Sequence, residues 1–199
     1  MTATSVPGVR IESNERPRHG LQPRPLAQVQ ADTMAFLTGQ AGFAQVVTIN
    51  RDGFPVGRTM VAPVNPDWSI DLVQRRVHRR LGQVSRNPRV EVVWVGNPAP
   101  GSVNDRPHVY DFGLDVPRVV FLRGLAEVMD GDWTLERYRR QTAVQRAKGL
   151  TKAPERSDDD VGEELVGIRV RPLQVRAEGF GVGAQSYTWT VGENEEGGP

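Results

Sequence analysis

The sequence contains no cysteine and only two lysines among its 199 residues. Without cysteine, the chain cannot form disulfides, thiolate zinc sites, iron–sulfur clusters or a cysteine nucleophile. It also has no apolar run near the ~20 residues that a membrane-spanning helix needs. The chain does not begin with a basic segment followed by an apolar one, so we expect a cytoplasmic protein that is not bound to a membrane.

An excess of one charge is also missing, because 25 Lys and Arg residues balance 24 Asp and Glu residues to a formal net charge of +1. This balance argues against a nucleic-acid coat, a basic membrane-surface protein or an acidic tail protein. All the basic residues except Lys148 and Lys152 are arginine. A guanidinium group binds phosphate and carboxylate better than an ammonium group does, so the position of each arginine matters.

The composition predicts one globular domain between two flexible ends. Apolar residues make up 38% of the chain and charged residues 25%, as in ordinary globular proteins. Residues 1–25 contain four prolines and four arginines but few large apolar side chains, and we expect a flexible arm there. Residues 192–199 are rich in Gly and Glu and are expected to form a flexible acidic tail. The domain is therefore expected over residues 26–191.

Local patterns predict a mainly β domain. Helices are expected at residues 26–38, 77–86 and 133–148, and strands at residues 44–50, 55–64, 68–74, 89–95, 118–129, 164–170, 173–177 and 186–191. An Asp-Gly turn joins the first two strands, and Gly124 predicts a bulge. Residues 152–160 are expected to be irregular, and the proline-rich segment 96–117 to be a functional or mobile loop.

These segments predict a small antiparallel barrel of six or seven strands. The interior of so small a barrel is filled by side chains. A ligand is therefore expected on the outside, in a groove or at a subunit interface.

Several common sites are missing from the sequence. Its three histidines, His19, His78 and His108, are not at metal-ligand spacing, so no metal site is expected. There is no nucleophile elbow and no P-loop. The glycine-rich run at residues 179–183 lacks the spacing of a dinucleotide-binding motif and is interpreted as a turn.

The informative cluster is basic. Arg58 lies on the second expected strand, and residues 75–80 (Arg-Arg-Val-His-Arg-Arg) lie where the third strand ends and the second helix begins. Guanidinium groups at such a place can bind a phosphate dianion, but they can equally form a solvated basic face. No aromatic residues alternate with these arginines, which disfavours a nucleic-acid partner.

The same residues carry a family resemblance. Residues 53–60 (Gly-Phe-Pro-Val-Gly-Arg-Thr-Met), 77–81 (Val-His-Arg-Arg-Leu), 87–90 (Asn-Pro-Arg-Val) and 119–129 resemble the flavin-binding split barrel of the pyridoxamine 5′-phosphate oxidase-like superfamily. The resemblance covers most of residues 33–177. It implies a six-stranded antiparallel split β-barrel with flanking helices, forming a homodimer with two cofactor sites across its interface.

The resemblance implies FMN as the cofactor, with the deazaflavin F420 as the alternative. Arg58 matches an arginine that approaches the flavin phosphate, and Arg79 and Arg80 match an Arg-Lys pair that clamps it. The backbone of Met60 and Val61 matches positions that face the isoalloxazine ring. Gln74 and His78 stand where the family often has hydroxyl side chains. The full expected cofactor-binding set is Arg58, Thr59, Met60, Val61, Gln74, Arg75, His78, Arg79 and Arg80.

The family includes several functions, and the sequence favours a flavin-dependent oxidoreductase that acts on a small molecule. Residues 184–191 depart from the Arg- and His-containing end that handles the vitamin B6 phosphate, so vitamin B6 oxidation is not expected. The alternatives are an F420-dependent reductase and a non-catalytic flavin- or haem-binding protein. No catalytic residue is assigned, although His108, Tyr110 and Asp111 in the long loop are candidate acid–base groups.

Overall fold

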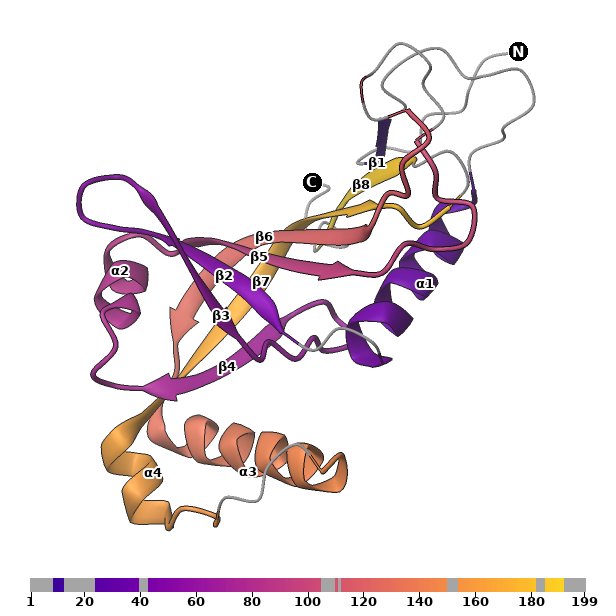
Figure 1. Cartoon of the computed structure of the whole chain (residues 1–199). Helices are drawn as coiled ribbons and strands as arrows, with labels where there is room; N and C mark the ends of the chain where they lie inside the picture. The colour runs from indigo at the N-terminus through magenta and orange to yellow at the C-terminus, as the bar shows by residue number, and fades with distance from the viewer. Residues whose placement is uncertain are drawn as a thin grey trace, which may run out of the picture.

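The computed structural model describes residues 9–12, 24–39, 43–104, 110, 112–149, 154–181 and 185–191. These residues form eight strands and four helices (Figure 1). Their bounds are β1 (Val9–Glu12), α1 (Leu26–Gly39), β2 (Ala44–Ile49), β3 (Pro55–Met60), β4 (Ile70–Arg75), α2 (Arg80–Arg86), β5 (Arg89–Gly96), β6 (Arg118–Val128), α3 (Gly131–Ala147), α4 (Asp158–Glu164), β7 (Leu165–Glu178) and β8 (Ser186–Thr190). The predicted mainly β structure with flanking helices is confirmed.

Six strands form a barrel that is open along one side. They pair antiparallel in the order β3-β2-β5-β6-β7-β4, and within the described residues β3 and β4 are not paired with each other. The long strand β7 pairs with β4 through its first half and with β8 through its second half. The barrel therefore has two free strand edges, on β3 and β4.

Alternating side chains fill the barrel interior. Val90, Val92 and Trp94 are buried on one face of β5, as the sequence predicts, and they join Val120 and Leu122 from β6 in one core. Such alternation buries one face of an antiparallel sheet. Because side chains occupy the interior, a ligand has to bind at the surface.

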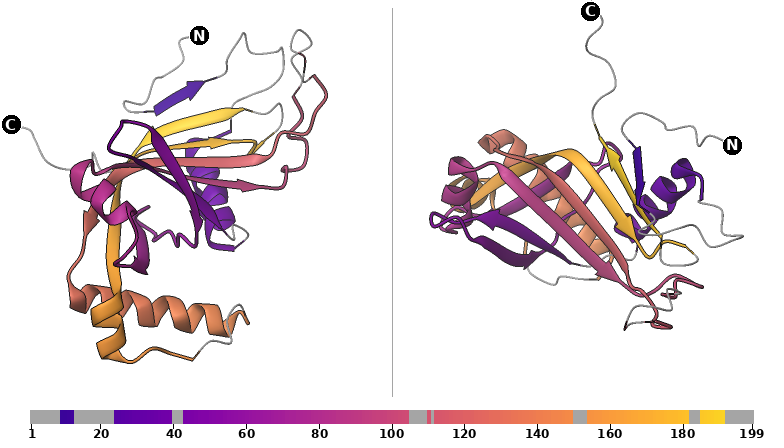
Figure 2. Two further views of the ribbon diagram at one scale, coloured as in Figure 1. Left: turned by 60° about the vertical axis from the view of Figure 1, so that its left-hand side comes forward. Right: turned by 90° about the horizontal axis from the view of Figure 1, so that it is seen from above.

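The helices cover different parts of the barrel. α1 and α2 lie at opposite ends, whereas α3 and α4 lie together below it in the view of Figure 1. Figure 2 shows β7 running from α4 up into the sheet. α3 packs on the outside of β4 and β7, where Gln141 donates a hydrogen bond of 2.9 Å to the Asp71 carbonyl.

Two segments differ from the sequence predictions in the C-terminal half. The segment 152–160, expected to be irregular, includes the first residues of α4 (Asp158–Glu164), which begins with a capping box between Ser157 and Asp160. The strands expected at 164–170 and 173–177 are one strand, β7. Pro172 does not interrupt it, because the register with β6 shifts between Arg123 and Gly124 and leaves Leu173, next to Pro172, as an extra residue on β7, where the ladder of hydrogen bonds is already irregular.

The structure describes part of the expected N-terminal arm and none of the expected acidic tail. Within the arm expected over residues 1–25, residues 9–12 form β1 and pair with β8. The guanidinium of Arg24 bonds to Asp32 and to the Phe180 carbonyl. The expected acidic tail lies outside the described residues. None of the helices formed by the described residues has the length and apolar character needed to cross a bilayer.

Gly167 on β7 allows α3 to approach the sheet. A Cβ atom at this position would lie 2.5 Å from the Trp133 ring and 2.9 Å from Thr134 Oγ1. We expect Gly167→Ala to lower the free energy of unfolding by about 1–3 kcal/mol, because the packed contact cannot accept another methyl group.

The matched control is Gly162→Ala in α4, where a new Cβ atom would meet no atom within 4 Å. This change is expected to be neutral or stabilising, since alanine favours a helix over glycine. Urea denaturation of both variants measures the difference. Equal stabilities would contradict the close packing of α3 on β7.

Candidate anion-binding site at the open side of the barrel

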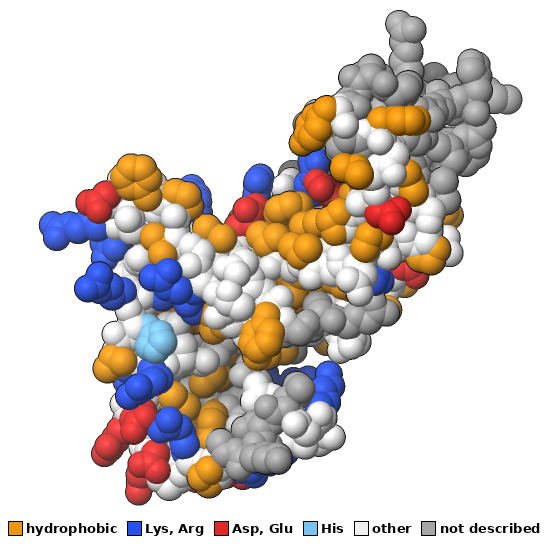
Figure 3. Space-filling view, in the orientation of Figure 1, with side chains coloured by type: hydrophobic (Ala, Val, Ile, Leu, Met, Phe, Trp, Pro, Cys, Tyr) orange, Lys and Arg blue, Asp and Glu red, His pale blue; other side chains and the backbone are white. Residues whose placement is uncertain are grey.

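A groove of about 420 Å³ lies at the open side of the barrel. It is bounded by the ends of β3 and β4, the turn before α2, and one face of α3. The residues that line it are Thr59, Met60, Val73, Gln74, Arg75, His78, Arg80, Tyr138, Gln141, Thr142, Gln145, Arg156 and Leu165. Basic side chains gather on the left edge of the molecule in Figure 3 around α2, and acidic side chains lie below them, where α4 lies.

Arg80 connects the two free edges of the barrel. Its guanidinium Nη1 donates a hydrogen bond of 3.0 Å to Gln74 Oε1 on β4 and lies 2.6 Å from Met60 Sδ on β3. The residue is only 8% exposed. Arg80 therefore holds the barrel together at the place where no backbone ladder does so.

The charge of Arg80 is not balanced by a carboxylate. Among the described residues, no Asp or Glu forms an ion pair with Arg80 or with its neighbours Arg58, Arg75 and Arg79. Burial lowers the pKa of the Arg80 guanidinium, and the positive charge of Arg58 lowers this pKa further. An anion in the groove would relieve both effects.

Two buried donors next to this charge have no partner. Arg80 Nε and Gln74 Nε2 make no hydrogen bond within the described part of the chain. A buried N–H group without an acceptor costs free energy, which a bound oxygen atom would recover. The site thus offers positive charge and unused N–H donors together, which is the chemistry that binds a phosphate or carboxylate.

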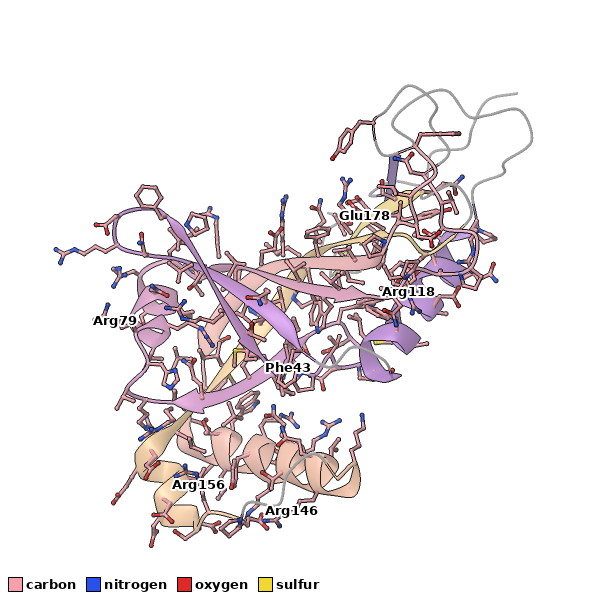
Figure 4. The ribbon with its side chains drawn as sticks, viewed as in Figure 1. Phe43, Arg79, Arg118, Arg146, Arg156 and Glu178 are labelled. Carbon is pink, nitrogen blue, oxygen red and sulfur yellow. The ribbon has the colours of Figure 1, made fainter. Side chains whose placement is uncertain are left out.

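The structure brings most of the expected cofactor-binding residues together. Thr59, Met60, Gln74, Arg75, His78 and Arg80 line the groove. Val61 lines a neighbouring cavity. Arg58 and Arg79 are exposed and do not line the groove, although Arg58 is close enough to affect the pKa of Arg80. Figure 4 shows Arg79 beside α2, at the edge of the molecule.

The second helix is shorter than the sequence predicts. It begins at Arg80, not at Val77, and contains seven residues. Residues 76–79 form turns, and Arg79 at the N-cap makes no side-chain capping bond. The affinity of the groove for an anion therefore depends on guanidinium side chains and not on the helix.

The wall of the groove formed by α3 was not predicted as part of the site. Tyr138, Gln141, Thr142 and Gln145 share one helix face and are uncharged, unlike most of their neighbours on α3. This polar stripe at helical spacing is the signal that identifies the wall. Val144 is 48% exposed and lines the neighbouring cavity.

Arg156 completes this side of the groove. Its backbone N–H donates to the Tyr138 hydroxyl at 3.0 Å, and its guanidinium forms an ion pair with Glu164 at 2.5 Å. In Figure 4, Arg156 lies beside α4. The segment 152–160 gave no sequence signal for this position beyond its charge.

Of the candidate acid–base groups in the long loop, the structure describes only Tyr110, which does not line the groove. Tyr110 is fully exposed, and His108 and Asp111 lie outside the described residues. The described part of the loop is partly ordered by a bridge between Val103 and Asp115. Within the described residues, no group of three or more His, Asp or Glu side chains is placed to hold a metal ion.

Comparisons with known proteins identify the fold. Neither the protein-family models nor the curated protein sequences that we compared with the chain gave a match. Solved structures do match it at low identity. A candidate pyridoxamine 5′-phosphate oxidase from Listeria innocua is 19% identical, with a TM-score of 0.51 over 75% of this chain and 97% of that one.

Two other matches cover more of this chain. A candidate 5-nitroimidazole antibiotic resistance protein from Bacteroides thetaiotaomicron is 12% identical, with a TM-score of 0.53 over 93% of this chain and 91% of that one. A haem-binding protein from Mycobacterium smegmatis is 22% identical, with a TM-score of 0.52 over 84% of this chain and 60% of that one. With the barrel open between β3 and β4, these matches show that the chain has the split-barrel fold of the pyridoxamine 5′-phosphate oxidase-like proteins.

Proposed function

We propose that the chain is an oxidoreductase that binds FMN, with the phosphate of the cofactor held at Arg80. The observation that carries the proposal is the buried, unbalanced guanidinium of Arg80 at the edge of an open groove. Bound FMN supplies hydride transfer between its ring and a small organic substrate. The protein's part is to bind and orient the cofactor and the substrate.

The residues of the groove fit a phosphate group. Arg80 Nε and Gln74 Nε2 are free to donate to phosphate oxygens, and Arg75 and His78 border the same groove. Met60 and Thr59 lie at the end of β3, and Val61 follows them. A ring placed along this backbone, as the resemblance implies, would extend from the phosphate site toward α3.

Two alternatives use the same groove. The phosphate and acidic tail of F420 would also be attracted to the arginines, which would make the chain an F420-dependent reductase. The second alternative is a non-catalytic flavin- or haem-binding protein, and the structural likeness to the haem-binding protein supports it. His78 and Met60 also support it, because both side chains line the groove and both can ligate haem iron.

We also propose that the chain forms a homodimer. Several large apolar side chains of the barrel are exposed, among them Phe43 at 65%, Phe54 at 68% and Val95 at 64%. Exposed apolar surface of this kind is typical of a contact with another chain. A second copy would then close the open side of the cofactor groove, and a small-molecule substrate would enter beside it.

The absorption spectrum of the purified protein, alone and after titration with each cofactor, separates these candidates. Two flavin bands support the proposal, a single deazaflavin band supports the F420 alternative, and a Soret band supports haem binding. We expect Arg80→Ala to weaken FMN binding by about 100-fold, because it removes more than one charge-assisted hydrogen bond.

Exposed arginines serve as controls for Arg80. Arg79→Ala is expected to weaken FMN binding by less than about tenfold, because its side chain does not line the groove. Arg51→Ala in the β2–β3 turn should have no effect. Equal losses in the Arg80 and Arg51 variants would contradict the phosphate assignment, and so would an Arg80 variant that retains FMN with unchanged affinity.

A second test leaves Arg80 in place and cancels its charge. Gln74→Glu puts a carboxylate at the atom that now accepts the Arg80 hydrogen bond. The new ion pair is expected to maintain or raise the free energy of unfolding and to lower the affinity for inorganic phosphate by at least about tenfold.

Gln145→Glu provides the matched change of charge. Gln145 lines the same groove but makes no hydrogen bond to Arg80. Its replacement is expected to lower phosphate affinity by about twofold, through longer-range repulsion alone. Isothermal titration calorimetry measures both variants. If Gln74→Glu bound phosphate as tightly as the unmodified protein, the unbalanced charge of Arg80 would not be the basis of the site.

A further inference from the structure

A second, smaller cavity adjoins the groove. It has a volume of about 150 Å³ and lies between α3 and the chain segment that joins β3 to β4. Its lining residues are Val61, Pro63, Val64, Asn65, Asp71, Arg137, Arg140, Gln141, Val144 and Gln145. Gln141 and Gln145 line both this cavity and the groove. A molecule in the cavity would therefore be next to a cofactor in the groove.

The polar part of the cavity is an ion pair between the buried Asp71 and the half-buried Arg137. Arg137 Nε lies 3.0 Å from Asp71 Oδ2, and the Asp71 side chain is only 4% exposed. Asn65 Nδ2 donates to the same oxygen at 3.0 Å. The other carboxylate oxygen, Oδ1, is buried and has no donor within the described residues.

Arg137 is also incompletely bonded. Its Nε is close to Asp71, but the geometry is not that of a hydrogen bond. Nη1 contacts Glu136 at 3.1 Å, and the guanidinium lies over the Trp133 ring at 5.3 Å. No hydrogen bond within the described residues involves Nη2. The fixed guanidinium therefore keeps a donor for another molecule.

An ion pair of this kind contributes little to the stability of the fold. Removing two charges from water costs several kcal/mol per ion, and only complete hydrogen bonding offsets this cost. Here one carboxylate oxygen of Asp71 and two guanidinium nitrogens of Arg137, Nε and Nη2, make no hydrogen bond within the described residues. Both residues line the cavity, whose other walls include Val61, Pro63 and Val64.

We propose that this cavity binds a small uncharged carboxamide or lactam. The N–H group of the ligand donates to Asp71 Oδ1, its carbonyl accepts from the guanidinium of Arg137, and its apolar part contacts the valine and proline side chains. A neutral ligand is expected because Asp71 and Arg137 already balance each other, and the third charged lining residue, Arg140, is exposed to solvent. The volume suits a small ring and excludes a drug-sized molecule.

The assignment of this ligand as the substrate of the reaction rests on the proposed function, whereas its binding does not. Val61 lines the cavity, and Val61 is also a position whose backbone the resemblance places against the flavin ring. A carboxamide in the cavity would lie beside that ring. Asp71 and Arg137 would then determine which small molecules the enzyme accepts.

The test uses benzamide as the probe and N,N-dimethylbenzamide as its matched control. Ligand-detected NMR titration of the full chain measures both affinities. Benzamide is expected to bind at least about tenfold more tightly, because only benzamide can donate an N–H to a buried carboxylate. Equal affinities, or no binding of benzamide, would overturn the proposal.

Two variants locate the bound probe. Val144→Phe narrows the cavity from a half-exposed position on α3 and leaves the ion pair intact, so benzamide affinity should fall about tenfold without loss of thermal stability. Ala143→Phe adds the same ring to the neighbouring exposed position, which does not line the cavity, and should bind benzamide normally. The same affinity in both variants would overturn the proposal.

Asp71→Asn tests the role of the carboxylate. It is expected to lower benzamide affinity about tenfold, but it also leaves Arg137 buried without its counter-ion and so lowers stability. For this reason the Val144 variant decides the outcome if Asp71→Asn does not fold. Titration with FMN is a separate measurement: benzamide binding without FMN binding would refute the proposed function and leave this inference standing.

Discussion

The open side of the barrel depends on Arg80. Six antiparallel strands leave β3 and β4 with free edges, and the guanidinium of Arg80 contacts a side chain from each of them. A neutral side chain could bridge these edges without the cost of burying a charge. The proposed phosphate site uses the same charge, so in that proposal one residue both bridges the strand edges and binds the cofactor.

The rest of the site follows from how β7 and α3 are arranged. β7 pairs with β4 and β6 and therefore fixes where the free edge of β4 lies. Gly167 on β7 lets Trp133 approach, and this contact sets α3 against the outside of the sheet. The polar stripe of α3 then faces the open side of the barrel. A groove forms because the helix covers the gap between β3 and β4 without filling it.

Local signals were sufficient to predict most of the elements. The Asp-Gly turn between the first two expected strands and the strand expected at residues 89–95 depend on neighbouring residues, and both are found in the structure. The capping box of α4 was also present in the sequence but was obscured by the charged segment around it. The continuity of β7 was not predictable locally, because Pro172 lies beside a register shift in the pairing of β7 with β6, and that pairing is a tertiary contact.

The site was predictable only in part, for a physical reason. The sequence indicates that arginines gather at residues 75–80, but Arg79 and Arg80 are adjacent and differ in which way they point at the start of α2. Arg79 is exposed and Arg80 is buried. The contribution of α3 depends on tertiary packing, and a polar stripe on a charged helix has no meaning until the sheet beneath it is known.

The surroundings of the arginines, more than their number, distinguish a binding site from ordinary surface. Arg123, Arg139 and Arg156 each pair with a carboxylate at the surface, where such pairs contribute little. The buried Arg80 and the half-buried Arg137 differ from these and from each other. Arg80 has no carboxylate partner within the described residues, which is why we propose that it binds an anion, whereas Arg137 forms an ion pair with Asp71. The groove and the smaller cavity share Gln141 and Gln145, so a charged cofactor in the groove and an uncharged substrate in the cavity would lie in contact. The balance of charge at each place would determine which of the two molecules binds there.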